Sequence, residues 1–480
     1  MKNCSFSKGY VQTVGELPFR VHLFTEAQID LYIKYCTKEK YSYVHMDATG
    51  GILKKMRGQN QILLYAAIFK DGADCINTLP LGHAMISDHT FPSVCFFLTS
   101  LVHEIKELKK KFIKPSFFII DFSATLMNSI LISFNEENIN SHLIRCWNVV
   151  NRHYDTTQLQ SISFIHFCCA HAIKAIARSL NTAGVDKKLR KGVLHIFSFI
   201  LCGNNLEQLY DILGMVINIF GDPDELNGKE KFEKLISLEL KVDEESVTFL
   251  SDTDGILREA KKKNSQLRVV DEYFRSNSAI IHQSPFNIEA IKRYPSLTKL
   301  INNKSKYDPI NNTLFSPSLI RIFYRWWAYL PLWTGLLWSF KERYANDLEV
   351  NMSVIYHPIR HSNALIESYF RTLKHSILQN TVDTKPQNVI QQIYRNIQLK
   401  LKAIKYDVTQ SSKGRKGRKR KKNMDGEWSK RGVGQKCRKM YVKAIDEFAS
   451  KKGLSKVKKD QLKTTVKQSR YSYYACDFFL

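Results

Sequence analysis

The stretch from Phe117 to Phe134 constrains the fold of this chain more than any other. It opens with four adjacent apolar residues, continues through Asp121 and then shows apolar residues at helical spacing. A short run that is apolar at every position is typical of a strand buried on both faces, so it predicts an α/β sheet covered by helices. A carboxylate is costly to bury alone, and ligand sites of such sheets lie at the carboxyl ends of strands. Asp121 is therefore a candidate site residue, with capping of the next helix as its alternative role.

A second acid, Asp47, stands at the end of another expected strand. An alternating run over 41–47 ends in it, and a turn signal follows at 49–51. Apolar runs at 61–70 and 81–88 predict two further strands joined by short connections. These three strands are expected to form an antiparallel meander.

Strands and helices then alternate. Apolar residues at three- and four-residue steps predict a helix over 91–112, and the stretch 162–180 predicts a strand that passes into a helix. The resulting order predicts a mixed five-stranded sheet flanked by helices, the arrangement of the RNase H-like fold.

Helical periodicity throughout 185–345 predicts a large all-α insertion. Tryptophans crowd into its last part, and large aromatic side chains usually dominate buried area, so we expect core packing. Stacking of one of them on an unpaired base is the alternative. These tryptophans are Trp326, Trp327, Trp333 and Trp338.

A third acid, Glu367, follows the insertion. The segment 357–378 carries an apolar face at helical spacing, and Ser362 or Asn363 can cap it. Glu367 is therefore expected about one turn inside a new helix, beside an apolar face where a solvated charge is hard to explain.

Positive charge is concentrated near the C-terminus. The chain has 480 residues and a net charge of +27, and residues 400–470 hold 25 Lys or Arg against 6 Asp or Glu. The run at 411–426 is typical of nuclear-import signals and of segments that bind phosphate backbones. Its expected nucleic-acid-binding residues are Lys413, Arg415, Lys416, Arg418, Lys419, Arg420, Lys421 and Lys422.

The composition predicts an intracellular, reduced and soluble protein. Ten cysteines show no regular spacing, no N-terminal run resembles a signal peptide, and no apolar run is long enough to span a bilayer, so no membrane partner is expected. The expected divisions are an N-terminal remnant at 1–40, the sheet domain at 41–184 and 346–404, the all-α insertion at 185–345, and a basic, partly disordered C-terminal region at 405–480.

Three acids on strand, strand and helix suggest metal chemistry. Crowded carboxylates repel one another unless divalent ions neutralise them, and hard oxygen ligands suit Mg²⁺ or Mn²⁺. One such ion would activate the oxygen that attacks a phosphodiester, and a second would stabilise the oxygen that leaves. We therefore expect Asp47, Asp121 and Glu367 to be both catalytic residues and metal ligands.

The pattern resembles the DDE transposases, in particular the Mutator-like (MULE) group and the related hAT group. The resemblance covers about residues 40–400 and rests on Asp47 in HMDATG, Asp121 in FIIDFSATL, Cys168 and His171 in FCCAHAIK, and Glu367 in RHSNALIESYF. It implies metal-dependent cleavage and transfer of double-stranded DNA, with transposon ends and target as substrates, a nuclear location and a homo-oligomer. It also implies a structural role near the catalytic acids for Cys168 and His171.

Two departures from the family's pattern bear on function. The stretch between Asp121 and Cys168 is longer than is usual in the Mutator-like group, and the N-terminal zinc-binding DNA-recognition domain is missing from the sequence. A truncated or domesticated copy is therefore expected.

Zinc is not expected at Cys168 and His171, because a zinc site requires about four ligands and no second pair is near in sequence. For the whole chain, an active transposase is the leading hypothesis. A catalytically silent nuclear DNA-binding protein is the alternative, and an RNA- or chromatin-associated adaptor held by the basic region ranks last.

Overall fold

The computed structural model describes residues 9–38, 42–70, 78–155, 158–159, 161–237, 278–302, 311–337 and 362–412. Contacts divide the chain into two compact units, Met1–Ile404 and Lys405–Leu480. The description below concerns the first unit. No helix among the described residues is long and apolar enough to cross a membrane.

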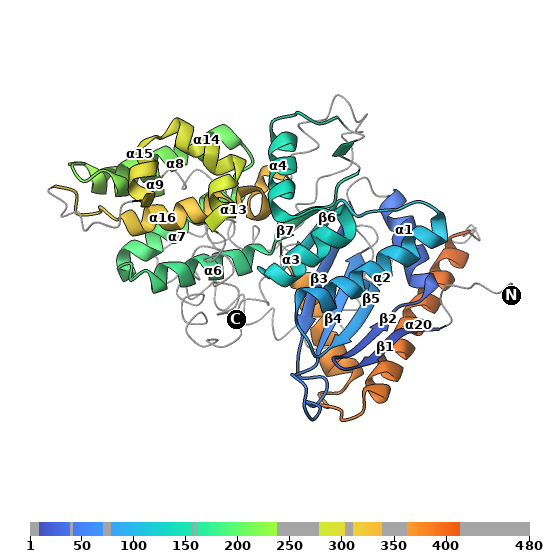
Figure 1. The fold of residues 1–480 in the computed structure, drawn as a ribbon. Coiled ribbons are helices and arrows are strands. Elements are labelled where there is room, and N and C mark those ends of the chain that lie inside the picture. Colours follow the sequence, from blue (N-terminus) through green and yellow to red (C-terminus); the bar gives the residue numbers. More distant parts are fainter. Residues whose placement is uncertain are drawn as a thin grey trace, which may run out of the picture. The chain divides into compact units, whose positions relative to one another are not determined.

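A seven-stranded mixed sheet forms the centre of this unit (Figure 1). Its order is β1-β2-β5-β4-β3-β6-β7, in which β3, β6 and β7 run parallel and the other neighbours pair antiparallel. The strands are β1 (Val11–Glu16), β2 (Phe19–Leu23), β3 (Tyr43–Thr49), β4 (Leu63–Lys70), β5 (Thr78–Ile86), β6 (Phe117–Ile120) and β7 (Phe164–Phe167).

The predicted count of five strands is wrong. All five expected strands are present as β3 to β7, and the two additional ones come from the segment predicted as an N-terminal remnant. Strand β2 pairs with β5, for example Leu23 with His83, and β1 pairs with β2. The sequence pattern of β1 does not predict a strand, because β1 has no fully buried residue and therefore no apolar face to recognise. The domain limits themselves stay predictions.

The two faces of the sheet carry separate cores. On β4, Tyr65 and Ala67 belong to one core, whereas Leu64 and Ala66 belong to the other, as expected for side chains that alternate along a strand. The first face is covered by α1 (Glu26–Lys38), α2 (Phe91–Lys109) and α3 (Ala124–Ile130) (Figure 1). The second is covered by α19 (Ala364–Thr372), the π-helix η4 (Leu373–Ile377) and α20 (Pro386–Ser412).

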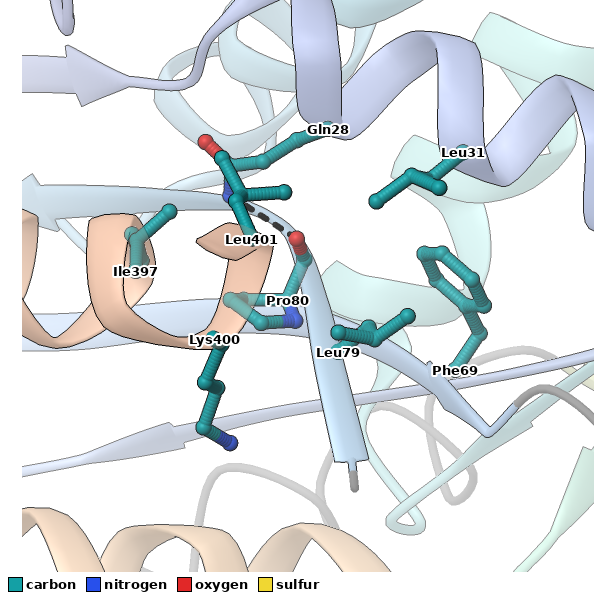
Figure 2. A pocket seen from close by; sticks show the side chains of 8 residues that line it. All are labelled: Gln28, Leu31, Phe69, Leu79, Pro80, Ile397, Lys400 and Leu401. Carbon is teal, nitrogen blue, oxygen red and sulfur yellow. Dashed lines mark hydrogen bonds between the residues drawn. The ribbon is translucent and has the colours of Figure 1, made fainter. Parts of the chain in front are cut away.

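Strand β5 carries a proline, which strands tolerate mainly at edges and irregularities. Its pairing with β4 is irregular beside Pro80, and the carbonyl oxygen of Pro80 accepts a hydrogen bond of 2.8 Å from Gln28 on α1. Lys400 on α20 donates to the carbonyl oxygen of Thr78 at 2.6 Å. Figure 2 shows the small hollow between these elements, and its lining residues include no carboxylate, thiol or imidazole. We therefore assign it to packing.

Every described element between residues 185 and 345 is helical. Trp326, Trp327 and Trp333 are buried there, so the predicted core packing is confirmed for these three, and Trp338 lies outside the described residues. The helices of this part are α7 (Lys187–Cys202), α8 (Leu206–Gly221), α9 (Gly228–Ser237), α13 (Ser278–Gln283), α14 (Pro285–Arg293), α15 (Ser296–Asn302), α16 (Pro317–Trp327), α17 (Leu330–Trp333) and the 3₁₀-helix η3 (Gly335–Leu337).

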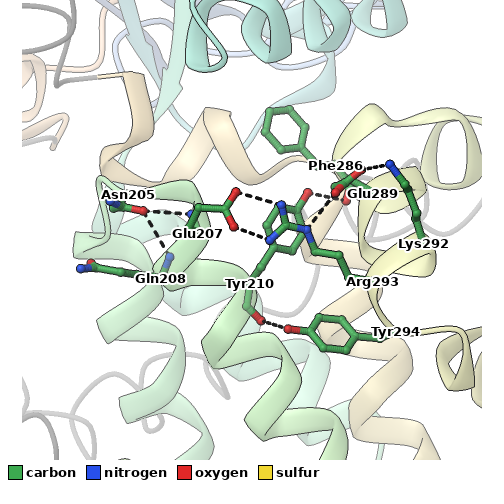
Figure 3. A network of polar contacts seen from close by, with 9 residues as sticks. All are labelled: Asn205, Glu207, Gln208, Tyr210, Phe286, Glu289, Lys292, Arg293 and Tyr294. Atoms are coloured by element: carbon green, nitrogen blue, oxygen red, sulfur yellow. Dashed lines mark hydrogen bonds and ion pairs between the residues drawn. The ribbon is translucent and has the colours of Figure 1, made fainter.

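A polar network joins α8 to α14 in this part (Figure 3). Arg293 donates to Glu207 at 2.8 Å and to Glu289 at 2.8 Å, and its guanidinium lies 4.3 Å from the centre of the Tyr210 ring. Because the side chain of Glu207 is 68% exposed, we expect this ion pair to contribute no more than about 1 kcal/mol. We therefore assign this network to fixing α8 against α14, and not to a catalytic or binding role.

Candidate active site

Asp47 and Asp121 are brought together by parallel pairing of β3 with β6. Met46 lies opposite Ile120 in this pairing, and the two acids come next, Asp47 within β3 and Asp121 directly after β6. Met46 belongs to the core of the first face, which leaves Asp47 on the second face, opposite Ala66 of the second core. The strand pattern alone therefore directs Asp47 toward the face covered by α19.

Glu367 lies in the first turn of α19, as predicted. Its neighbour Ile366 is fully buried in the core of the second face, whereas Glu367 itself is exposed. The backbone N–H of Glu367 donates to the carbonyl oxygen of Asn363 at 2.9 Å. The side-chain amide of Asn363 in turn donates to Oδ1 of Asp121 at 2.7 Å. The start of the helix that carries Glu367 is thus fixed to Asp121.

Asp121 does not cap the helix that follows it. The N-cap of α3 is Ser123, whose hydroxyl oxygen accepts from the N–H of Leu126. The Asp121 side chain instead contacts Asn363 and His171, which come from distant parts of the chain. The alternative role considered for Asp121 is therefore wrong.

The three acids act on one another electrostatically. Burial raises the pKa of Asp47 well above its ordinary value, and the neighbouring charges of Asp121 and Glu367 raise it further. The N–H of Ala48, 2.6 Å from Asp47 Oδ1, and the charge of His171 oppose this shift. Burial and the two neighbouring acids therefore both disfavour a negative charge on Asp47.

Cys168 and His171 lie at the start of α6 (Cys169–Thr182), immediately after β7. Cys168 is buried, and its N–H donates to the carbonyl oxygen of Ile120 at 2.8 Å. His171 Nδ1 lies 3.1 Å from Asp121 Oδ1. Burial favours the neutral ring, but the Asp121 carboxylate and the contact with Cys168 outweigh it and raise the pKa of His171 to about 9. His171 therefore supplies positive charge beside Asp121 at neutral pH.

Asp121, Cys168 and His171 also form a set of donor atoms suited to a metal ion. One oxygen, one sulfur and one nitrogen lie within 4.8 Å of one another. Thiolate and imidazole favour zinc over Mg²⁺, yet no fourth His, Cys or carboxylate joins this set within the described part of the chain. The absence of zinc stays a prediction.

Two residues of this corner were missed at the sequence level. Asn363 was considered only as a cap, although its side chain makes no capping hydrogen bond. Lys374 lies in η4, where burial lowers its pKa and the charge of Asp47 opposes that effect. The sequence feature that points to Lys374 is its spacing of seven residues from Glu367. Seven residues are about two helical turns, so the two side chains lie on one helix face. The tail cations predicted between 413 and 422 lie outside the described residues.

Comparisons with known proteins found a similarity to a protein of a transposable element. No family model matches the chain. It is 22% identical over 348 residues to the 120.7 kDa protein in NOF-FB transposable element of Drosophila melanogaster, a match covering 69% of this chain and 29% of that protein. A solved structure, the Drosophila P element transposase strand transfer complex, aligns with a TM-score of 0.31 and 10% identity over 78% of this chain and 80% of that one. The chain spans less than a third of its curated relative and is similar to a protein encoded by a transposable element.

Proposed function

We propose that this chain contains the catalytic part of a DDE-type transposase of the Mutator-like group, with an RNase H-like sheet, that cuts and joins double-stranded DNA. The observation that carries this proposal is the connection of β6 to the start of α19 through Asn363, beside the end of β3, together with the influence of Asp121 and Glu367 on the pKa of Asp47. The similarity to a transposable-element protein supports it. Transposon ends and target DNA are the proposed partners, the nucleus is the proposed location, and a homo-oligomer is the proposed assembly.

The residues of this corner fit divalent cations of the hard type. Their carboxylate oxygens are the ligands that Mg²⁺ and Mn²⁺ prefer, and added positive charge would offset both the burial and the acidic neighbours that raise the pKa of Asp47. Asp47, Asp121 and Glu367 would hold the ions. Bound divalent ions would supply a nucleophilic oxygen and stabilise the leaving oxygen of a phosphodiester.

The protein's own groups prepare this corner for a phosphodiester. Asp47 is fixed by a strand buried on both sides, and Asp121 is held by Asn363 and His171. Glu367 is exposed at the start of its helix, where a large polyanion can approach it. Lys374, a half-buried lysine of η4 that interacts electrostatically with Asp47, would offset phosphate charge.

The test is nicking of supercoiled plasmid by the 480-residue protein with Mg²⁺ or Mn²⁺. Asp121→Asn and Glu367→Gln should each lower the rate by about 100-fold or more, because a neutral amide provides neither the charge nor the ligand set for a hard cation. Asp224→Asn, an exposed acid of the helical part, is the matched control and should nick at the wild-type rate. Equal rates for all four proteins would assign the activity to a contaminant or to other residues.

One observation favours a second candidate, the catalytically silent DNA-binding protein. Asp121 already has a positive partner in His171 and does not require a cation for charge balance. A wild-type protein that binds duplex DNA but neither nicks it nor binds Mn²⁺ would establish this alternative. The basic run of the C-terminal region would then account for the affinity.

A further inference from the structure

Asn363 contacts three of the residues implicated in the candidate active site. Its side-chain amide donates to Asp121 Oδ1 at 2.7 Å, and its backbone N–H donates to Cys168 Sγ at 3.3 Å. Its carbonyl oxygen accepts the N–H of Glu367 at 2.9 Å. One residue therefore joins the ends of β6 and β7 to the first turn of α19.

Local helix formation does not explain this asparagine. Its side chain makes no capping hydrogen bond, and the N–H of Ala364 is served by the hydroxyl of Ser362 at 3.4 Å. Asn363 is fully buried, and its side chain also interacts with that of His45 on β3. A buried amide costs free energy unless it makes hydrogen bonds, so an apolar residue would be favoured here if the amide had no partner. The hydrogen bond that the amide donates to Asp121 is therefore the contact that explains an asparagine at this position.

The contacts of Asp121 are concentrated on one oxygen. The Asn363 amide and His171 Nδ1 both lie close to Oδ1, and no hydrogen bond or ion pair to Oδ2 is found among the described residues. The side chain is 26% exposed. A carboxylate held by one oxygen in this way has a fixed orientation and keeps its second oxygen for a ligand.

We propose that Asn363 is a positioning residue that orients the Asp121 carboxylate for a divalent cation and sets its place relative to Glu367. This inference rests on the proposed function, since it assigns to Asn363 the support of the cation ligands. Hydrogen-bond partners of metal ligands typically contribute 10- to 100-fold to metal affinity, and we expect about that loss when the amide is removed.

The decisive variant is Asn363→Leu, which keeps nearly the same side-chain shape and removes the donor. Its matched control is Asn287→Leu. Asn287 is also fully buried, donates to the carbonyl oxygens of Ile281 and Tyr324, and has an unpartnered Oδ1, but it lies in the helical part. Both substitutions remove a buried amide, so they separate loss of stability from loss of cation affinity.

The experiment measures Mn²⁺ binding to the full chain without DNA, from the electron paramagnetic resonance signal of the free ion. We expect Asn363→Leu to raise the Mn²⁺ dissociation constant by about 10- to 100-fold and Asn287→Leu to leave it unchanged. Nicking by Asn363→Leu should recover at high Mn²⁺ concentration. Unchanged affinity in a folded Asn363→Leu protein would overturn the proposal.

Two further arms separate this proposal from the function on which it rests. A wild type that binds Mn²⁺, together with an Asp121→Asn variant that does not, supports the function regardless of Asn363. A wild type that binds no Mn²⁺ overturns both. Asn363→Ala is the second variant, and if it and Asn363→Leu both fail to fold while Asn287→Leu folds, the residue is structural and the proposal is overturned.

Discussion

Replacing Tyr369 by Phe should loosen the helix that carries Glu367. Tyr369 lies two residues beyond Glu367 on α19, and its hydroxyl is 2.7 Å from His83 Nε2 on β5. The other ring nitrogen of His83, Nδ1, lies 3.1 Å from the hydroxyl of Tyr10, next to β1. All three side chains are buried. This row of hydrogen bonds connects the N-terminal hairpin, the middle of the sheet and the candidate catalytic helix.

The size of the effect follows from the protonation state of His83. Burial lowers the pKa of His83 to about 3, so the ring is neutral, with one N–H that donates and one nitrogen that accepts. Loss of the Tyr369 hydroxyl leaves one buried ring nitrogen unpartnered, which costs about 1–3 kcal/mol. Tyr10→Phe removes the other partner and keeps the ring that stacks on Tyr394, with ring centres 4.9 Å apart. Since both changes act on one histidine, the double variant should deviate from additivity by about 0.5 kcal/mol or more.

Native-state hydrogen exchange is the suitable assay because it reports the free energy of opening α19 itself. Tyr210→Phe is the matched control, since its buried hydroxyl donates to the carbonyl oxygen of Phe286 in the helical part at 3.0 Å. That change should affect α8 and α14 and leave α19 as in the wild type. A loss below about 0.5 kcal/mol for Tyr369→Phe, or strict additivity with Tyr10→Phe, would refute the reasoning.

Two further predictions concern pH and salt. Burial lowers the pKa of His22 and His166 to about 4 and that of His83 to about 3, whereas the unfolded chain takes up these protons near pH 6.5. The stability that depends on these three neutral histidines should therefore be complete above about pH 6.5 and fall as the pH approaches 3, by about 2 kcal/mol per histidine at pH 5. Urea unfolding at pH 7.5 and pH 5 checks this, and equal stability would contradict it. The logarithm of the affinity for duplex DNA should fall linearly with the logarithm of the salt concentration. Replacing the eight Lys and Arg residues between 413 and 422 by Gln should make the slope of this line less negative by up to about 7. Replacing eight exposed lysines elsewhere is the control, and an unchanged slope would exclude this run from the DNA contact.

The parts of the fold that could be predicted are those in which local pattern and burial agree. Strand β6 is apolar at every position because it is covered on both faces, and β3 alternates so that Asp47 leaves the first core. The two acids therefore follow from sequence periodicity and strand pairing. Glu367 follows from helical spacing, although its exposure contradicts the expectation of a charge held in an apolar environment.

The remaining features depend on contacts between distant residues. Strands β1 and β2 are held by pairing with β5, and β1 on its own has no buried side chain to mark it. The hydrogen bond from Asn363 to Asp121 joins residues 242 positions apart. An asparagine just before a helix predicts a cap on local grounds, and tertiary structure has directed its amide elsewhere. No local pattern carries that information.

Charge balance at Asp121 links the two candidate functions. His171 is cationic beside this carboxylate, so the folded chain can exist without a metal, as a silent DNA-binding protein would require. The positive charge of His171 does not offset the effects on Asp47 as well. The pKa of Asp47 remains raised by burial and by its acidic neighbours even with His171 nearby. Asp47, whose pKa is raised by burial and further by its acidic neighbours, is therefore the residue of this corner that a bound cation would stabilise most.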